Sequence, residues 1–220
     1  MAGDGQGDFP WASLRREMVE VQLLGRGIRD RHVLEAMGGL PREEFVSADQ
    51  RAAAYEDRPL PVGPGQTISQ PYIVAYMTEK LEVSPGDRVL EVGGGTGYQA
   101  ALLSMMGAQV VALEIDPRLV QEAEARLARL NIKGVRFIRG DGTLGYPDLA
   151  PYDRIIVTAG APRVPPALVH QLREDGRLIM PVGGPAQQIL VCVIRNREGT
   201  TEHPLIPCRF VKLVGEQGWD

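Results

Sequence analysis

A glycine-rich segment near the middle of the chain is the clearest candidate for chemistry. Residues 93–98 (Gly-Gly-Gly-Thr-Gly-Tyr) follow an apolar stretch at 88–92 and precede a segment with helical spacing. Glycines at such a turn let a ligand approach the backbone, and the first N–H groups of the helix can donate hydrogen bonds to it. A purely structural tight turn is the alternative, because glycine also accepts positive φ.

The spacing of these glycines excludes two common phosphate-binding loops. A dinucleotide loop needs its third glycine at position 98, where Tyr98 stands. A P-loop needs a lysine followed by serine or threonine, and the segment has neither at that place. The loop therefore favours a ligand that carries little phosphate.

Two acidic residues follow the next two apolar stretches. Glu114 ends the first and could accept hydrogen bonds from ribose hydroxyls, whereas Asp141, placed between Gly140 and Gly142, could accept one from an exocyclic amine such as that of adenine. Taken singly, Glu114 could be a solvated strand end and Asp141 a turn residue. Because three successive strands would deliver such groups to one sheet edge, we favour a nucleoside-binding site.

The elements that must position these residues follow from apolar periodicity. Beyond residue 69, short apolar stretches alternate with segments of helical spacing, which predicts right-handed crossovers and a doubly wound, mostly parallel α/β sheet. We expect helices at 71–81, 96–106, 117–130 and 165–173. We expect seven strands, at 88–92, 109–115, 135–139, 154–158, 177–181, 189–195 and 208–214, the last ones antiparallel at one side of the sheet.

The amino-terminal part has a different pattern. Apolar residues between Trp11 and Leu24 recur at helical spacing, a second helix is expected after Asp30, and a short helical turn at 41–46. The prolines and glycines of residues 59–65 predict an irregular loop. Residues 1–8 are expected to form a disordered tail, and residues 9–220 a single domain, with a helical cap and substrate loop at 9–68 and a cofactor-binding core at 69–220.

Composition restricts the classes of partner. With 24 basic and 28 acidic side chains the net charge is -4, which gives no general attraction for nucleic acid. The two cysteines, Cys192 and Cys208, lack metal-ligand spacing and fit a reducing compartment; buried thiols are favoured over the alternative of one disulfide. No apolar run is long enough to span a membrane, and no signal peptide is recognisable. We expect a cytoplasmic, monomeric protein that binds neither metal, membrane nor nucleic acid.

Several segments carry a resemblance to known proteins. Residues 89–98 resemble the first motif of class I S-adenosylmethionine methyltransferases, which have a Rossmann-like sheet, and residues 111–114 resemble their acidic motif. One family among them, the protein-L-isoaspartate O-methyltransferases, is similar at residues 41–46, 65–71, 140–142, 151–157, 161–162 and 176–183. The matches keep the family's order, and the Thr-Ile-Ser-x-Pro segment at 67–71 is absent from generic methyltransferases. Lys212 stands where the family usually has proline, and Gly94 where it has serine or threonine.

The resemblance implies a repair enzyme. Its activity would transfer the methyl group of S-adenosyl-L-methionine, with S-adenosyl-L-homocysteine as product, to the free carboxylate of L-isoaspartyl and D-aspartyl residues in damaged proteins and peptides. It implies Ser69 as the catalytic residue and a substrate site made of Thr67, Ile68, Ser69, Phe210 and Val211. The residues that it implies for the cofactor are Gly93, Gly94, Gly95, Thr96, Gly97, Tyr98, Glu114, Ile115, Asp141, Gly142 and Thr158.

The chemistry fits the residue types. A carboxylate is already ionised at neutral pH, so it can attack a sulfonium methyl without a general base, and no converging histidine is expected. Ser69 can donate its hydroxyl to one carboxylate oxygen; it could also cap the helix entered through Pro71, and the two roles are compatible. Phe210 and Val211 are expected to offer an extended edge to the substrate backbone.

Two further hypotheses remain open at this point. The same scaffold could methylate a small molecule or an RNA base, because fold does not determine function. The chain could also be a cofactor-binding protein without catalysis. The serine-bearing segment and the lack of a basic, aromatic-rich face favour the repair enzyme over both.

Overall fold

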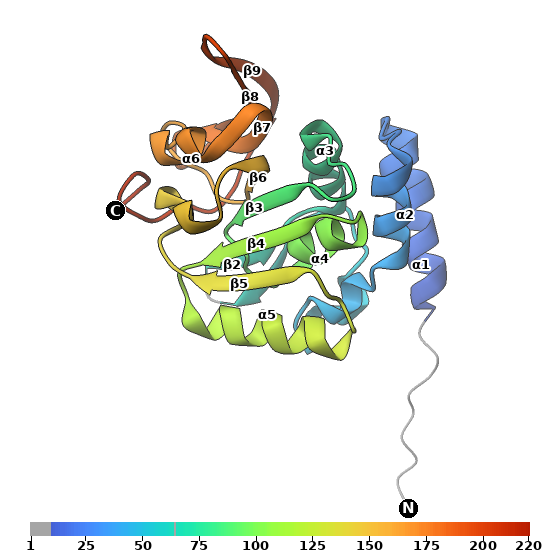
Figure 1. The fold of residues 1–220 in the computed structure, drawn as a ribbon. Coiled ribbons are helices and arrows are strands. Elements are labelled where there is room, and N and C mark those ends of the chain that lie inside the picture. The colour runs from blue at the N-terminus through green and yellow to red at the C-terminus, as the bar shows by residue number, and fades with distance from the viewer. Residues whose placement is uncertain (1–9, 64) are drawn as a thin grey trace, which may run out of the picture.

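The computed structural model describes residues 10–63 and 65–220, so the tail expected at 1–8 lies outside the described residues. Its main feature is a seven-stranded sheet in the order β5-β4-β3-β6-β7-β8-β9 (Figure 1). The strands are β3 (Arg88–Val92), β4 (Gln109–Glu114), β5 (Val135–Arg139), β6 (Tyr152–Val157), β7 (Leu172–Gly183), β8 (Gln188–Asn196) and β9 (Gly199–Cys208). Strands β3 to β7 pair in parallel, and β8 and β9 are antiparallel. The expected fold class is confirmed.

The order of the strands creates a switch point between β3 and β6. From β3 the chain proceeds outward to β4 and β5, then returns to place β6 on the other side of β3. The loops that leave β3 and β6 therefore diverge, and in open α/β sheets ligands bind in the crevice between such loops.

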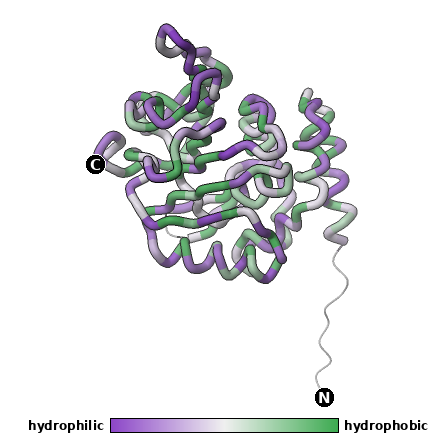
Figure 2. Tube along the Cα trace, in the orientation of Figure 1, coloured by the Kyte–Doolittle hydropathy of each residue, from purple (hydrophilic) through white to green (hydrophobic). Residues whose placement is uncertain are grey.

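Alternate residues of each central strand point to opposite faces of the sheet, as strand geometry requires. Val89 belongs to a core formed with the amino-terminal helices and with α3 (Pro71–Leu81), α4 (Tyr98–Met105) and α5 (Pro117–Arg129). Its neighbour Leu90 belongs to a second core, formed with α6 (Pro166–Gln171). Helix α5 alternates hydrophilic and hydrophobic residues along its turns, and it buries Ala123 and Leu127 (Figure 2).

The helical cap is present as expected. Helix α1 (Trp11–Glu17) continues through a π-helical turn (Met18–Leu23) and a 3-10 turn (Leu24–Arg26), and α2 (Arg31–Gly39) follows. Asp30 caps α2 by accepting a hydrogen bond from the Val33 N–H at 3.0 Å. Two 3-10 segments, Arg42–Glu44 and Ala48–Ala53, complete the cap.

Two expectations about secondary structure were wrong. Residues 59–65 include strand β1 (Leu60–Gly63), which pairs antiparallel with β2 (Gln66–Ile68). The prolines had suggested a loop, but proline is tolerated in edge strands, and both strands of a two-stranded sheet are edges. The last strand is β9, not 208–214. Strand β9 is an exposed edge with little apolar alternation. Residues 210–214, which are apolar except for Lys212, line a cavity and make only isolated bridges.

Smaller differences concern element ends. Helix α4 begins at Tyr98 because Gly97 adopts a left-handed conformation, with φ of 83°, that a helix cannot contain. Strand β7 is longer than expected, since α6 already ends at Gln171. Among the described residues no helix is long and apolar enough to cross a membrane.

Candidate active site

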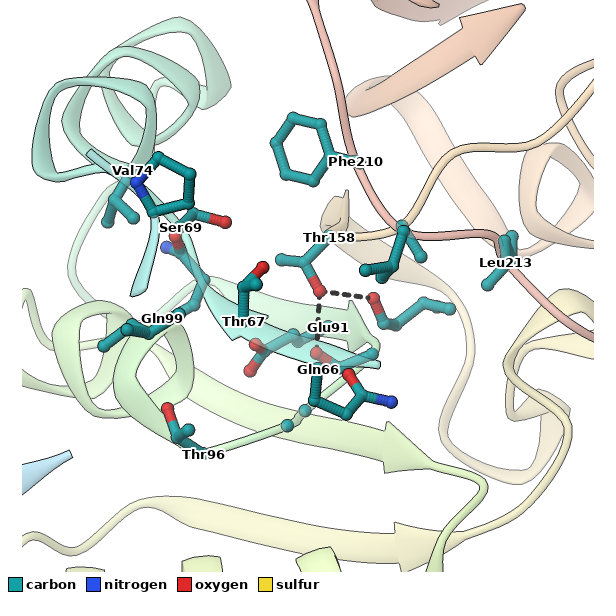
Figure 3. A pocket seen from close by; sticks show the side chains of 18 of the residues that line it. Gln66, Thr67, Ser69, Val74, Glu91, Thr96, Gln99, Thr158, Phe210 and Leu213 are labelled. Carbon is teal, nitrogen blue, oxygen red and sulfur yellow. Dashed lines mark hydrogen bonds between the residues drawn. The ribbon is translucent and has the colours of Figure 1, made fainter. Parts of the chain in front are cut away.

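A cavity of about 410 Å³ lies at the carboxyl ends of β3, β4 and β6. This volume is within the range of small-molecule sites, roughly 300–1,000 Å³. The sheet side is formed by the glycine loop, the end of β4 and the loop after β6, and the opposite side by residues 66–70 and 207–214. Figure 3 shows Glu91 and Thr158 on the sheet side, with Thr67, Ser69 and Phe210 around the same space.

Thr158 links the ends of β3 and β6 at the switch point. Its hydroxyl lies 2.7 Å from the Gly93 carbonyl oxygen and 3.1 Å from that of Val92. Gly93 has φ of 90°, and a Cβ atom there would lie 2.6 Å from the Thr158 oxygen. Position 93 therefore requires glycine both for its backbone conformation and for the space that Thr158 occupies.

Glu114 secures the other side of the glycine loop. Its carboxylate is 6% exposed and accepts hydrogen bonds from the Gly95 N–H at 2.9 Å and from the Asp116 N–H at 3.0 Å. Gly95 itself has open space around its missing Cβ, because the nearest atom would be the Gly93 carbonyl oxygen at 3.8 Å. The loop is thus held in shape from the protein side and open toward the cavity.

Most residues expected at the cofactor line this cavity, and two do not. Gly93, Gly94, Gly95, Thr96, Tyr98, Glu114, Ile115, Gly142 and Thr158 are in the lining. Gly97 is not; a Cβ there would meet Leu127 and Phe137 at 3.0 and 3.3 Å, so its place is a close contact with the core.

Asp141 is the second residue outside the lining. Its carboxylate accepts hydrogen bonds from the Thr143 N–H at 2.8 Å, the Thr143 hydroxyl at 2.7 Å and the Glu216 N–H at 2.8 Å. Although partial burial opposes ionisation, these hydrogen bonds lower the pKa of Asp141 below its ordinary value. In the structure Asp141 therefore attaches the carboxyl-terminal segment, and its expected contact with adenine stays a prediction.

Glu91 is a cavity residue that the sequence analysis missed. It lies within β3, is 1% exposed, and its Oε2 has no hydrogen-bond partner among the described residues. Burial, together with the negative charge of Glu114, raises the pKa of Glu91 well above its ordinary value. A carboxylate between buried apolar residues of β3, two positions before the first glycine, was the available signal. Its unpaired oxygen can accept a hydrogen bond from a cationic group of a ligand.

The substrate residues expected from the resemblance also converge here. Thr67, Ile68, Ser69, Phe210 and Val211 all line the cavity opposite the glycine loop. Helix α3 takes Gln70, not Ser69, as its N-cap and has no side-chain cap hydrogen bond. No hydrogen-bond partner of the Ser69 hydroxyl is found in the part of the chain described, so this group is available to a ligand. Ser69 does not act as the N-cap of α3.

A doubly wound sheet with a glycine loop at its switch point and an acid at the end of the next strand is an arrangement that binds nucleoside ligands, and it agrees with the resemblance to class I S-adenosyl-L-methionine-dependent methyltransferases. The model of one family, described as Protein-L-isoaspartate(D-aspartate) O-methyltransferase, matches residues 14–218. The chain therefore belongs to the protein-L-isoaspartate O-methyltransferase family, and the resemblance seen in the sequence is confirmed.

Individual relatives agree with this assignment. A protein-L-isoaspartate O-methyltransferase of Methanoregula boonei is 49% identical over 96% of this chain and 98% of its own length. One of Methanoculleus marisnigri is 52% identical over 93% of both chains. Among solved structures, a protein-L-isoaspartate O-methyltransferase superposes with a TM-score of 0.84 at 32% identity, covering 93% of this chain and 67% of the other. Another, from Plasmodium falciparum in complex with S-adenosyl-L-homocysteine, superposes with a TM-score of 0.80 at 27% identity, covering 91% and 98%.

The buried carboxyl group of Glu91 generates a test that needs no ligand. An acid whose pKa is higher in the folded than in the unfolded state contributes stability below its unfolded pKa and loses that contribution as the pH rises through the folded pKa. We expect Glu91→Gln, which cannot ionise, to raise the melting temperature relative to the wild type at about pH 8 and to do so much less at about pH 5. Thermal unfolding at both pH values measures this, with the exposed Glu124→Gln as control. An equal difference at both pH values would contradict it.

Proposed function

We propose that this chain methylates the free carboxylate of L-isoaspartyl and D-aspartyl residues in damaged proteins and peptides, and that Ser69 holds that carboxylate. The observation that carries the proposal is the composition of one cavity: the glycine loop and Glu114 line one side, and the Ser69 segment with residues 207–214 lines the other. A cofactor and a peptide carboxylate can therefore meet in a single space, as a methyl transfer requires.

The cofactor side is built from rigid groups. The open face of the glycine loop, the Glu114 carboxylate and the orphaned Glu91 oxygen are the groups that would hold S-adenosyl-L-methionine. When bound, this cofactor supplies a methyl group on a positively charged sulfur. Because Thr158 and Glu114 already fix the loop, little ordering is left to occur on binding.

On the substrate side the protein has to align and desolvate, not to move a proton. A carboxylate is ionised near neutral pH, so the Ser69 hydroxyl only has to donate a hydrogen bond to one of its oxygens. Ile68, which is 4% exposed, and the half-buried Phe210 exclude water beside it. Alignment of two reacting groups in this manner supplies up to about 7–11 kcal/mol of the barrier.

The backbone of residues 211–213 supports the proposed edge for the substrate peptide. The Gly160 N–H donates to the Val211 carbonyl at 2.7 Å, and the Leu213 N–H donates to the Gly160 carbonyl at 2.8 Å. Lys212 lies between these two residues, in a parallel bridge with Gly160. In such a bridge the N–H and carbonyl groups of Lys212 point away from Gly160. These two groups can pair with a peptide backbone while varied side chains are tolerated.

We further propose that the protein acts as a monomer in the cytoplasm without binding nucleic acid. Two observations support the compartment and the absence of nucleic-acid binding: Cys192 and Cys208 are free thiols, which suits a reducing compartment, and the net charge of -4 offers polyanions no general attraction.

Replacing Ser69 by alanine tests the central role. Loss of a hydrogen bond to a charged group is worth about 1.5–3 kcal/mol, so Ser69→Ala should reduce kcat/KM for an isoaspartyl peptide by roughly 10- to 100-fold. Affinity for S-adenosyl-L-homocysteine should stay the same. The assay is transfer of a labelled methyl group to an isoaspartyl peptide and to its aspartyl twin, with the exposed Ser84→Ala as control. Unchanged turnover would remove Ser69 from the reaction, and methylation of both twins would contradict the proposed substrate.

Lys212 gives the substrate edge a positive charge that can be tested separately. It is exposed at the cavity with its Nζ 5.5 Å from the Trp219 ring centroid, and the exposed Arg209 lines the same cavity. An exposed ion pair contributes about 0.2–1 kcal/mol, so isoaspartyl peptides with glutamate neighbours should have a KM roughly two- to fivefold lower than those with lysine neighbours. Lys212→Glu should remove this difference in KM, because the new carboxylate offsets the charge of Arg209, and high salt should reduce the difference in the wild type. Identical KM values for both peptides in the wild type at low salt would contradict the expectation.

A further inference from the structure

Arg42 is a cation that the fold buries completely. Its side chain is 0% exposed; Nε donates to the Ala54 carbonyl at 2.7 Å, and Nη2 donates to the Ser69 carbonyl at 2.6 Å. The guanidinium carbon lies 5.0 Å from the centroid of the Tyr98 ring. Nη1 has no hydrogen-bond partner among the described residues.

This burial is energetically costly and needs a reason. Among the described residues no carboxylate forms an ion pair with Arg42; the adjacent Glu43 is instead paired with Arg15 at 3.0 Å. Removing a guanidinium from water is unfavourable, and here two hydrogen bonds and one aromatic face are its compensation. Because buried charges are a weak source of stability, the cation points to a role beyond stability.

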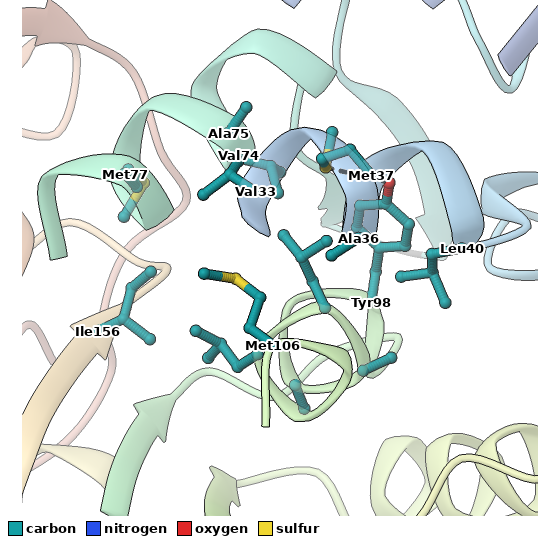
Figure 4. Close-up of a cluster of buried hydrophobic side chains, with 14 of the residues drawn as sticks. Val33, Ala36, Met37, Leu40, Val74, Ala75, Met77, Tyr98, Met106 and Ile156 are labelled. Atoms are coloured by element: carbon teal, nitrogen blue, oxygen red, sulfur yellow. Dashed lines mark hydrogen bonds between the residues drawn. The ribbon is translucent and has the colours of Figure 1, made fainter. Parts of the chain in front are cut away.

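The three partners of Arg42 belong to three different parts of the molecule. Ala54 directly follows the second 3-10 segment of the cap, Ser69 precedes α3, and Tyr98 is the first residue of α4, immediately after the glycine loop. Tyr98 is itself fixed, because it packs among residues of α2 and its hydroxyl lies 3.6 Å from the Met37 sulfur (Figure 4). One planar group therefore sets the distance between the Ser69 segment and the start of the glycine-loop helix.

The atom of Ser69 that Arg42 binds is the carbonyl oxygen, which leaves the hydroxyl available to the cavity. We propose that Arg42 is a positioning residue: it holds the backbone of Ser69 against Tyr98, so that the serine hydroxyl keeps its place relative to the cofactor loop. This inference rests on the proposed role of Ser69. It assigns to the helical cap a function in catalysis, since the cap supplies both Arg42 and the Ala54 carbonyl that orients it.

A double-mutant cycle separates this role from a structural one. Lysine keeps the charge but lacks the fork that reaches two carbonyls and stacks on a ring. A displacement of about 1 Å can cost about 100-fold in rate, so Arg42→Lys should reduce kcat/KM for an isoaspartyl peptide by roughly 10- to 100-fold. In the Ser69→Ala background the same change should have an effect of about threefold or less, because the group that Arg42 positions is gone. Binding of S-adenosyl-L-homocysteine should be unchanged in all variants.

Arg15→Lys is the matched control. Arg15 lies in the same cap and donates to Tyr55 at 2.8 Å and to Glu43, but unlike Arg42 it makes no hydrogen bond to Ser69. It should lower the melting temperature and leave kcat/KM unchanged. Should Arg42→Lys not fold, Arg42→Gln, which keeps one donor for the Ser69 carbonyl, takes its place in the cycle.

The possible failures are distinguishable. If Arg42→Lys reduces kcat/KM equally with and without the Ser69 hydroxyl, or weakens S-adenosyl-L-homocysteine binding in proportion, Arg42 does not act through Ser69 and the inference is wrong. If Ser69→Ala alone has no effect, the proposed role of Ser69 fails first, and the inference about Arg42 fails with it.

Discussion

The reversal of strand order between β3 and β6 is the constraint on which the site depends. It forces two adjacent parallel strands to send their loops to opposite sides, and Thr158 prevents the resulting gap from opening further by bonding the carbonyls at the end of β3. Gly93 is required there because the threonine oxygen occupies the space of a side chain. Thr158 and Gly93 therefore set the conformation of the glycine loop on its ligand side. Only this small part of the fold has to keep one particular geometry.

Two buried ionisable groups at this site lower the stability of the fold. Glu91 lies inside a sheet strand with an unpaired oxygen, and Arg42 lies inside the cap with an unpaired nitrogen. Each costs folding free energy. They face different halves of the same reaction space: the carboxyl group lies on the cofactor side, whereas the guanidinium lies behind the Ser69 segment. Only the Glu91 carboxyl group can meet a ligand directly, whereas Arg42 acts on the cavity through the backbone of Ser69.

Local patterns in the sequence were sufficient for strands β3 to β8 and, on the cofactor side of the cavity, for the glycine loop and Glu114, but not for β9 or Glu91. The glycine loop and Glu114 are separated by one helix, and strand and helix periodicities place them at one edge. Contacts between distant segments were not accessible in this way. Asp141 is engaged by a backbone N–H of Glu216, and Arg42 by the Ser69 carbonyl, and neither contact leaves a periodic trace in the sequence. Prolines concealed the β1–β2 hairpin, and the exposed β9 lacked the alternation that reveals a half-buried strand.

The wall of the cavity formed by residues 207–214 depends on the residues that follow it. Glu216 and Gln217 are tied to Asp141 and Thr143, and the Trp219 indole N–H donates to the Gly160 carbonyl at 2.9 Å. These anchors join residues 59 to 75 positions apart in the sequence. The glycine loop, in contrast, is held by Glu114, only 19 positions from Gly95. The two halves of the cavity therefore differ in origin: the nucleoside-binding half is a local product of consecutive elements, whereas the opposite half exists only when distant parts of the chain have come together.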